Sequence, residues 1–266
     1  CWEQQGFGGY TYGRYYIYKD REKYKQYNDY REHDFHDEYG IYRHRFSVPG
    51  QWRDKRIHIV FEGVMTDADV KVNGVSAGPV HQGGFYRFSY DITELVKFKG
   101  KNTLEVTVHK QSADPSVNAA ERRADWWLFG GIYRPVYLEA KPRMHIERFA
   151  VDARADGTLH TDVFLEQLQE NCRLELALST ADLQTLVGRQ VCKLSTDGKQ
   201  TLTTQWAGIK TWDPEHPNLY RLTLKLIDDK GTVVHEVTDC IGFRTIDFRP
   251  ADGIYLNGTR LLVKGT

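Results

Sequence analysis

Apolar residues recur at every second position along much of this 266-residue sequence. They do so in Ile57–Phe61 and Leu104–Val108, where most of the intervening residues are polar or charged. Successive side chains of a strand point to opposite faces of its sheet, so this period predicts strands with one buried face. Further strands are predicted near residues 41–48, 136–138, 146–151, 174–178, 222–226 and 233–237. The chain is therefore predicted to be β throughout.

The connections between these segments are short and contain turn-forming residues. Asn73-Gly74 predicts a two-residue hairpin, because both residue types tolerate a positive φ. Asp228–Gly231 is the turn expected between the segments 222–226 and 233–237. Asp91–Val96 has an N-cap residue and a short apolar stripe, which predicts about one turn of helix. Many short strands with such turns are typical of β-sandwiches, and we assign the chain to the all-β class.

Length and two local breaks predict the division into domains. A typical domain has about 100 to 200 residues, so this chain has room for two. A predicted strand meets Pro142 at 140–142, and a second break falls at 249–253. We expect one domain over residues 1–142, another over 143–248, and a final segment, 249–266, in which Gly253–Lys264 forms a strand leading into a further domain.

Charge and hydropathy argue against several classes of partner. The sequence has 36 Lys and Arg residues and 36 Asp and Glu residues, so it has no net field that would attract nucleic acid or anionic lipid. No apolar run approaches the roughly 18 residues that span a bilayer. We therefore expect neither a nucleic-acid nor a membrane partner. The sequence indicates no oligomeric state.

Cysteine and histidine spacing gives no metal signature, and we expect no metal and no cofactor. The four cysteines are predicted to be free thiols, with a disulfide between Cys172 and Cys192 as the alternative; they are Cys1, Cys172, Cys192 and Cys240.

Residues 120–138 contain the strongest candidate for a binding site. Asp125 follows two arginines and precedes the pair Trp126-Trp127, close to Gly130-Gly131. A sugar ring has hydroxyls at its rim and apolar C–H faces, so a carboxylate beside aromatic rings suits carbohydrate. We predict Asp125 and Trp126 as ligand-binding residues. The structural alternative is a tryptophan pair in the core and an aspartate paired with arginine at the surface.

Several motifs, in this order, resemble glycoside hydrolase family 2, which contains β-galactosidases, β-glucuronidases and β-mannosidases. The resemblance covers most of the chain from about Asp37 onward. It rests on Phe61–Val64, Asp69–Gly74, His81–Thr93, Ala120–Leu138, Trp212–Tyr220, Ile241–Arg244 and Tyr255–Gly258. It implies a jelly-roll, galactose-binding-like sandwich, then an immunoglobulin-like sandwich, then the lead-in to a (β/α)8 barrel.

The resemblance also implies roles for particular residues. In the family an acidic residue six positions before the second glycine reaches the active site and hydrogen-bonds the sugar, and here that residue is Asp125. Some members also use an asparagine three residues before a strand glycine. The matching position before Gly40 is Asp37, which cannot donate as an amide does.

The expected function is thus the non-catalytic N-terminal part of a retaining β-glycosidase, most similar to a β-galactosidase. Its expected partners are a carbohydrate substrate and the catalytic barrel of the same polypeptide, and a periplasmic or secreted location is favoured over a cytoplasmic one. No catalytic residue is expected within residues 1–266, because the family's glutamates lie on the barrel. The alternative is a stand-alone carbohydrate-binding or adhesion module.

Overall fold

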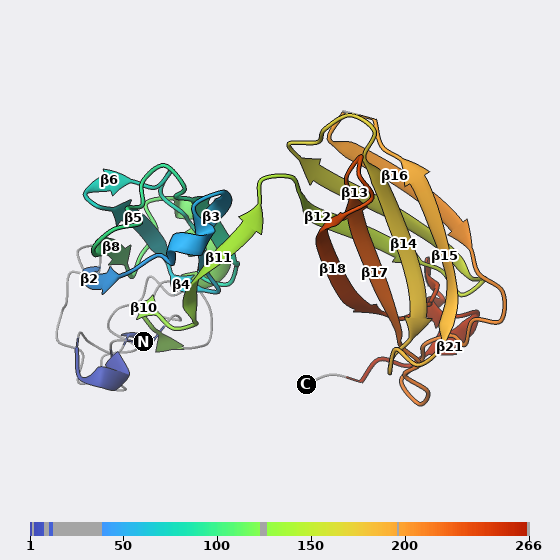
Figure 1. The fold of residues 1–266 in the computed structure, drawn as a ribbon. Helices are drawn as coiled ribbons and strands as arrows, with labels where there is room; N and C mark the ends of the chain where they lie inside the picture. The colour runs from blue at the N-terminus through green and yellow to red at the C-terminus, as the bar shows by residue number, and fades with distance from the viewer. Residues whose placement is uncertain (2, 8–10, 13–38, 123–126, 196, 265–266) are drawn as a thin grey trace. The chain divides into compact units, whose positions relative to one another are not determined.

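The computed structural model describes residues 1, 3–7, 11–12, 39–122, 127–195 and 197–264, with the backbone alone at residues 11, 12 and 127. The chain divides into two compact units, Cys1–Lys141 (unit 1) and Pro142–Thr266 (unit 2) (Figure 1). Strands dominate the regular structure of both units, which confirms the all-β class. In the part of the chain that the structure describes, no helix is long and apolar enough to cross a membrane.

Unit 1 contains eleven strands and four short helical segments among its described residues. The strands are β1 (Thr11–Tyr12), β2 (Tyr39–Phe46), β3 (Lys55–Phe61), β4 (Val64–Met65), β5 (Asp67–Val72), β6 (Val75–Ser76), β7 (Phe88–Asp91), β8 (Asn102–His109), β9 (Trp127–Leu128), β10 (Gly131–Ile132) and β11 (Val136–Pro142), which ends at the boundary. The helical segments are η1 (Glu3–Gln5), η5 (Gly50–Trp52), α2 (Pro115–Val117) and η6 (Asn118–Arg122).

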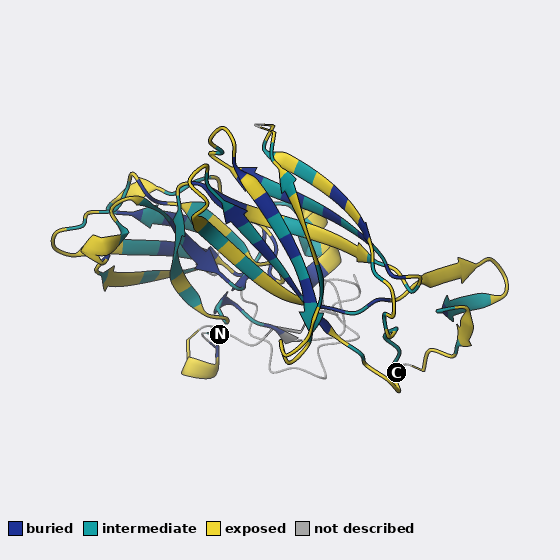
Figure 2. Ribbon diagram, turned by 45° about the vertical axis from the view of Figure 1, so that its right-hand side comes forward, coloured by how far each residue is buried: buried dark blue, intermediate teal, exposed yellow. Residues whose placement is uncertain are grey.

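Two larger sheets form the sandwich of unit 1. Their strand orders are β2-β8-β5-β6 and β11-β3-β7. The pairs β10-β4 and β1-β9 form separate two-stranded sheets. The alternating residues of β3 and β8 supply buried side chains to one core, including Ile57, Phe61 and Val106, each 0% exposed. Figure 2 shows the alternation of buried and exposed positions along the strands. The predicted strands at 57–61 and 104–108 are therefore confirmed.

The Asn73-Gly74 prediction is also confirmed. Val72 pairs with Val75 across the turn, and Asn73 and Gly74 have φ values of 52° and 83°. The Asn73 side chain adds a reason for the position, because its amide donates to the Leu95 carbonyl at 2.8 Å.

The turn predicted for Asp91–Val96 is present, but it does not extend into a longer helix. Asp91 does accept a hydrogen bond from the Thr93 amide at 2.9 Å, as an N-cap residue would. The Leu95 and Val96 amides both donate to the Ile92 carbonyl, at 2.9 and 3.2 Å. The Lys97 amide then donates to the Asn102 side chain at 2.7 Å instead of continuing a helical ladder. The segment is consequently a turn that ends on a side-chain acceptor.

Unit 2 contains a second sandwich and a small separate sheet. Its strands are β12 (His145–Ala153), β13 (Thr158–Glu166), β14 (Arg173–Thr180), β15 (Leu186–Lys193), β16 (Lys199–Gln205), β17 (Tyr220–Ile227), β18 (Val233–Ile241), β19 (Ile246–Arg249), β20 (Gly253–Leu256) and β21 (Thr259–Leu261). The sandwich sheets have the orders β12-β13-β16 and β15-β14-β17-β18. Leucines of β14 and β17, such as Leu176 and Leu224, face Leu159 and Val163 of β13 across one buried core.

The predicted lead-in strand, Gly253–Lys264, is instead a hairpin. β20 and β21 pair through a second Asn-Gly turn, in which Asn257 and Gly258 have φ values of 50° and 82°. Together with β19 they form a three-stranded sheet. The Asn257 side chain connects this sheet to the loop that precedes β17. It accepts from the Thr245 amide and donates to the Trp212 carbonyl in that loop.

All four cysteines are free thiols. Cys172 is buried, and its thiol lies 3.4 Å from the Met144 sulfur. Cys192 sits in β15 opposite Leu174. The alternative disulfide between Cys172 and Cys192 is therefore not formed.

Candidate functional site

The three residues predicted to bind ligand, Asp37, Asp125 and Trp126, lie outside the described residues. The structure does describe both ends of the loop that carries Asp125 and Trp126. That loop, residues 123–128, follows η6 and includes β9. Its two ends are held by buried charged side chains from other parts of unit 1.

Arg122 joins the two ends of the loop. Its side chain is only 1% exposed, although arginine is almost never fully buried without partners. Its guanidinium donates to the Lys110 carbonyl at 3.0 and 2.6 Å and to the Phe129 carbonyl at 2.7 Å. A guanidinium has five N–H donors in one plane, so it can bind two carbonyls at once. The Arg122 side chain therefore links the carbonyls of Lys110 and Phe129.

Glu3 supports the far end of the same loop. Its carboxylate accepts from the Gly130 amide at 3.0 Å and forms an ion pair with the Lys110 ammonium at 2.9 Å. Both side chains of this pair are buried, at 0% and 1% exposure. The N-terminal segment also contributes β1, which pairs with β9 in the register Thr11 to Leu128. Residues more than a hundred positions apart in the sequence thus meet at the base of the loop.

Glu121, in η6 at the start of this loop, is bonded to the segment that contains Gly83 and Gly84. Its carboxylate accepts from the Gly84 amide at 2.7 Å, and the Tyr133 hydroxyl donates to the Gly84 carbonyl at 2.7 Å. Gly83 has a φ of 110°, which disfavours any residue with a side chain. A Cβ at Gly84 would lie 3.1 Å from the Met65 side chain. The Gly83-Gly84 pair therefore serves close packing.

Asp67 lies beside this glycine segment at the start of β5 and is 3% exposed. One carboxylate oxygen accepts from the Ala113 amide at 2.8 Å and from the Gln82 side chain at 3.1 Å. The other oxygen has no hydrogen-bond partner among the described residues. Even with this carboxylate, the described residues contain no group of three or more His, Cys, Asp and Glu that could hold a metal ion.

The pKa of His81, which lies close to Gly83, clearly departs from its ordinary value. Its ring stacks on Phe88 with 3.7 Å between centroids, and its Nε2 lies 3.0 Å from the Gly83 carbonyl. Burial lowers the pKa of His81 below 6.5, although the Gly83 carbonyl and the carboxylates of Asp67 and Glu121 oppose the shift. The folded state therefore prefers the neutral imidazole.

This shift predicts how the stability of unit 1 depends on pH. Because the pKa of His81 is lower in the folded state than in the unfolded state, its contribution is complete above about pH 6.5 and is lost as the pH falls. We expect the unfolding free energy of His81→Gln to fall less steeply between about pH 7.5 and 5.5 than that of the wild type. Denaturant titrations at several pH values would measure this. Parallel curves would contradict it, and His44→Gln, which removes an exposed histidine of β2, is the control.

Sequence reasoning missed most of these supporting residues. The burial of Lys110 could have been predicted, because Lys110 continues the alternation of the buried residues Val106 and Val108. Glu3 and Glu121 carried none, because nothing local distinguishes them from surface carboxylates. The Arg134 guanidinium lies over the Tyr133 ring at 5.1 Å and donates to the Glu62 carbonyl at 3.4 Å.

Two family models match the chain in succession. The sugar binding domain of glycosyl hydrolases family 2 matches residues 2–142, and the glycosyl hydrolases family 2 model matches residues 144–244. The first match alone covers more than half of the chain. The chain belongs to glycosyl hydrolases family 2. The jelly-roll and immunoglobulin-like sandwiches implied by the resemblance are in accord with units 1 and 2.

Individual family 2 relatives match over most of the chain. A Formosa agariphila protein whose name includes beta-glucuronidase is 34% identical over 85% of the chain and 27% of its own length. A beta-galactosidase of Thermoanaerobacter pseudethanolicus is 32% identical over 84% of the chain and 31% of its own length. A crystal structure of Bacteroides uniformis beta-glucuronidase superposes with a TM-score of 0.70 at 25% identity, covering 85% of the chain and 29% of that protein. The chain thus spans about a quarter to a third of these family 2 relatives.

Proposed function

We propose that this chain is the non-catalytic N-terminal part of a retaining β-glycosidase. The single observation that carries the proposal is the succession of two family 2 models, the sugar-binding one first, along a chain about a quarter to a third as long as its relatives. Hydrolysis with retention requires two carboxyl groups about 5 to 5.5 Å apart, a nucleophile and an acid/base. In this proposal both belong to a (β/α)8 barrel of the same polypeptide.

The role proposed for unit 1 is to add Asp125 to the subsite that holds the terminal sugar. A carboxylate accepts hydrogen bonds from sugar hydroxyls, and such charge-assisted bonds are about twice as strong as neutral ones. Trp126 would lie against an apolar face of the sugar, and Asp37 is a second candidate acceptor. Arg122 and Glu3 support this role, because their side chains bond Phe129 and Gly130 at the end of the loop that carries Asp125. A loop with fixed ends loses less entropy when its side chains bind.

The substrate proposed is a terminal β-linked sugar of an oligo- or polysaccharide, with a β-galactoside preferred. Relatives with beta-galactosidase and beta-glucuronidase in their names both match this chain, so a panel of sugars is required.

Release of nitrophenol from aryl β-glycosides tests the proposal. We expect the full-length protein to hydrolyse at least one of the β-galactoside, β-glucuronide and β-mannoside, and a purified sample of residues 1–266 to hydrolyse none. Turnover by residues 1–266 alone would contradict the assignment as non-catalytic. A full-length protein that binds oligosaccharide without hydrolysing any glycoside would support the stand-alone binding module instead.

A further inference from the structure

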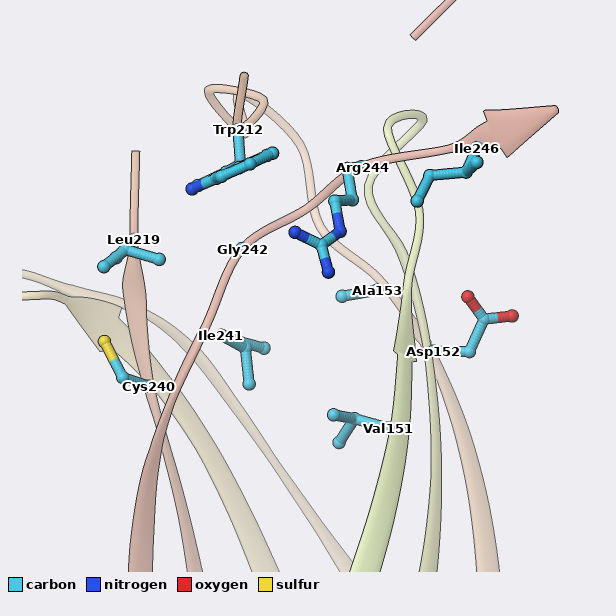
Figure 3. A pocket seen from close by; sticks show the side chains of 10 residues that line it. All are labelled: Val151, Asp152, Ala153, Trp212, Leu219, Cys240, Ile241, Gly242, Arg244 and Ile246. Atoms are coloured by element: carbon cyan, nitrogen blue, oxygen red, sulfur yellow. The ribbon is translucent and has the colours of Figure 1, made fainter. Parts of the chain in front are cut away.

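A pocket of about 540 Å³ opens at one end of the unit 2 sandwich (Figure 3). It lies where the end of β12, the end of β18 and the start of β19 come together with the loop that precedes β17. Arg244 points into the middle of it, beneath the ring of Trp212. The residues that line the pocket belong to unit 2, whereas Asp125 belongs to unit 1.

The walls of this pocket are fixed by backbone contacts. The Trp212 amide donates to the Phe243 carbonyl at 2.8 Å, and the Arg244 amide donates to the Ala153 carbonyl at 2.9 Å. Gly242 permits the close approach of the tryptophan, because a Cβ there would lie 2.9 Å from the Trp212 Cβ. The family motif Ile241–Arg244 therefore builds this pocket, with its glycine and its arginine in distinct roles.

Arg244 has a charge that the described residues leave unbalanced. Its guanidinium carbon lies 4.7 Å from the centroid of the Trp212 ring, a cation–π contact that orients it. None of the described carboxylates forms an ion pair with it. Asp152, which also lines the pocket, pairs with Arg154 at 2.9 Å. The guanidinium keeps its planar donors available for a carboxylate.

The surroundings of the guanidinium are apolar and exposed. Val151, Leu219 and Ile246 line the pocket and are 38%, 41% and 49% exposed. Exposed apolar side chains grouped around one charged group are typical of a surface that a partner covers.

We propose that this pocket receives an acidic side chain with apolar neighbours from the catalytic domain of the same polypeptide. This inference rests on the proposed function, since it requires that domain. Charge complementarity selects the carboxylate, and the stacked tryptophan holds the guanidinium ready for two parallel hydrogen bonds. The length of the relatives favours the same polypeptide as the source, because their chains are three to four times as long as the part matched here.

Arg244→Gln in two lengths of the protein tests the inference. In residues 1–266 the change removes an exposed cation–π contact, and we expect the melting temperature to fall by about 2 °C or less. In the full-length enzyme the change would leave a buried carboxylate unpaired. We expect the melting temperature of residues 1–266 within that enzyme to fall by about 5 °C or more. Arg244→Lys, which keeps the charge without the planar fork, should give an intermediate shift in the full-length enzyme.

Arg148→Gln is the matched control, because Arg148 is also exposed and stacks on an aromatic ring, Phe164, at 3.5 Å but does not line the pocket. Its effect should be the same in both lengths. Equal shifts for Arg244→Gln in both lengths, in an enzyme that hydrolyses a β-glycoside, would overturn this inference and leave the proposed function standing. A natural gene that ends at Thr266 would overturn both. Dimers of residues 1–266 that Arg244→Gln dissociates would assign the pocket to a second copy and also overturn it.

Discussion

Arg122→Met is expected to lower the unfolding free energy of unit 1 by about 3 to 5 kcal/mol. Methionine fills much of the same volume, so packing changes little. It cannot donate, however, and the Lys110 and Phe129 carbonyls each lose hydrogen bonds from a charged donor. A hydrogen bond to a charged group contributes about 1.5 to 3 kcal/mol, and two carbonyls are affected. Denaturant unfolding of residues 1–266, followed by tryptophan fluorescence, would measure the loss.

The control for this experiment is Arg43→Met on β2. Arg43 forms one exposed ion pair with Glu105 at 2.8 Å, and its side chain is 75% exposed. Exposed ion pairs contribute about 0 to 1 kcal/mol, so this variant should stay close to the wild type. A loss of less than about 1 kcal/mol in Arg122→Met would mean that the guanidinium does not hold the base of the loop.

The strands were predictable because their signal is local and repeated. Ile57–Phe61 and Leu222–Leu226 place apolar residues on one face, and burial in a sandwich requires little more. The Asn73-Gly74 hairpin was predictable for a similar reason, since its backbone conformation depends on those two residues. Asn257-Gly258 has the same hairpin signal, inside the segment that was predicted to be a single lead-in strand.

The supporting contacts were not predictable, because they depend on residues far apart in the sequence. Glu3 and Gly130 lie 127 positions apart in the sequence, and no local pattern marks Glu3 as buried. The segment Asp91–Val96 stops after one turn for a related reason, because Asn102, outside the segment, accepts from the Lys97 amide that would have continued the helix. Local pattern therefore predicted the sandwiches, and tertiary contacts decided the base of the candidate site.

Asp125 was singled out by its composition and by the family resemblance, and its role remains a proposal. In the full-length enzyme Asp125→Ala is expected to reduce kcat/KM for the preferred aryl β-glycoside by about 10- to 100-fold. The reason is the loss of one charge-assisted hydrogen bond to a sugar hydroxyl, which contributes about 1.5 to 3 kcal/mol. Asp125→Asn keeps one acceptor oxygen and should lose less. The control is Asp54→Ala, at an exposed aspartate of unit 1.

The most direct test of the account is the steady-state kcat/KM of full-length Asp125→Ala against that of the wild type, on protein shown by its melting temperature to be folded. The account predicts a loss of about 10- to 100-fold, with Asp54→Ala unchanged. An unchanged kcat/KM in folded Asp125→Ala would contradict the claim that this sugar-binding domain contributes Asp125 to the substrate site.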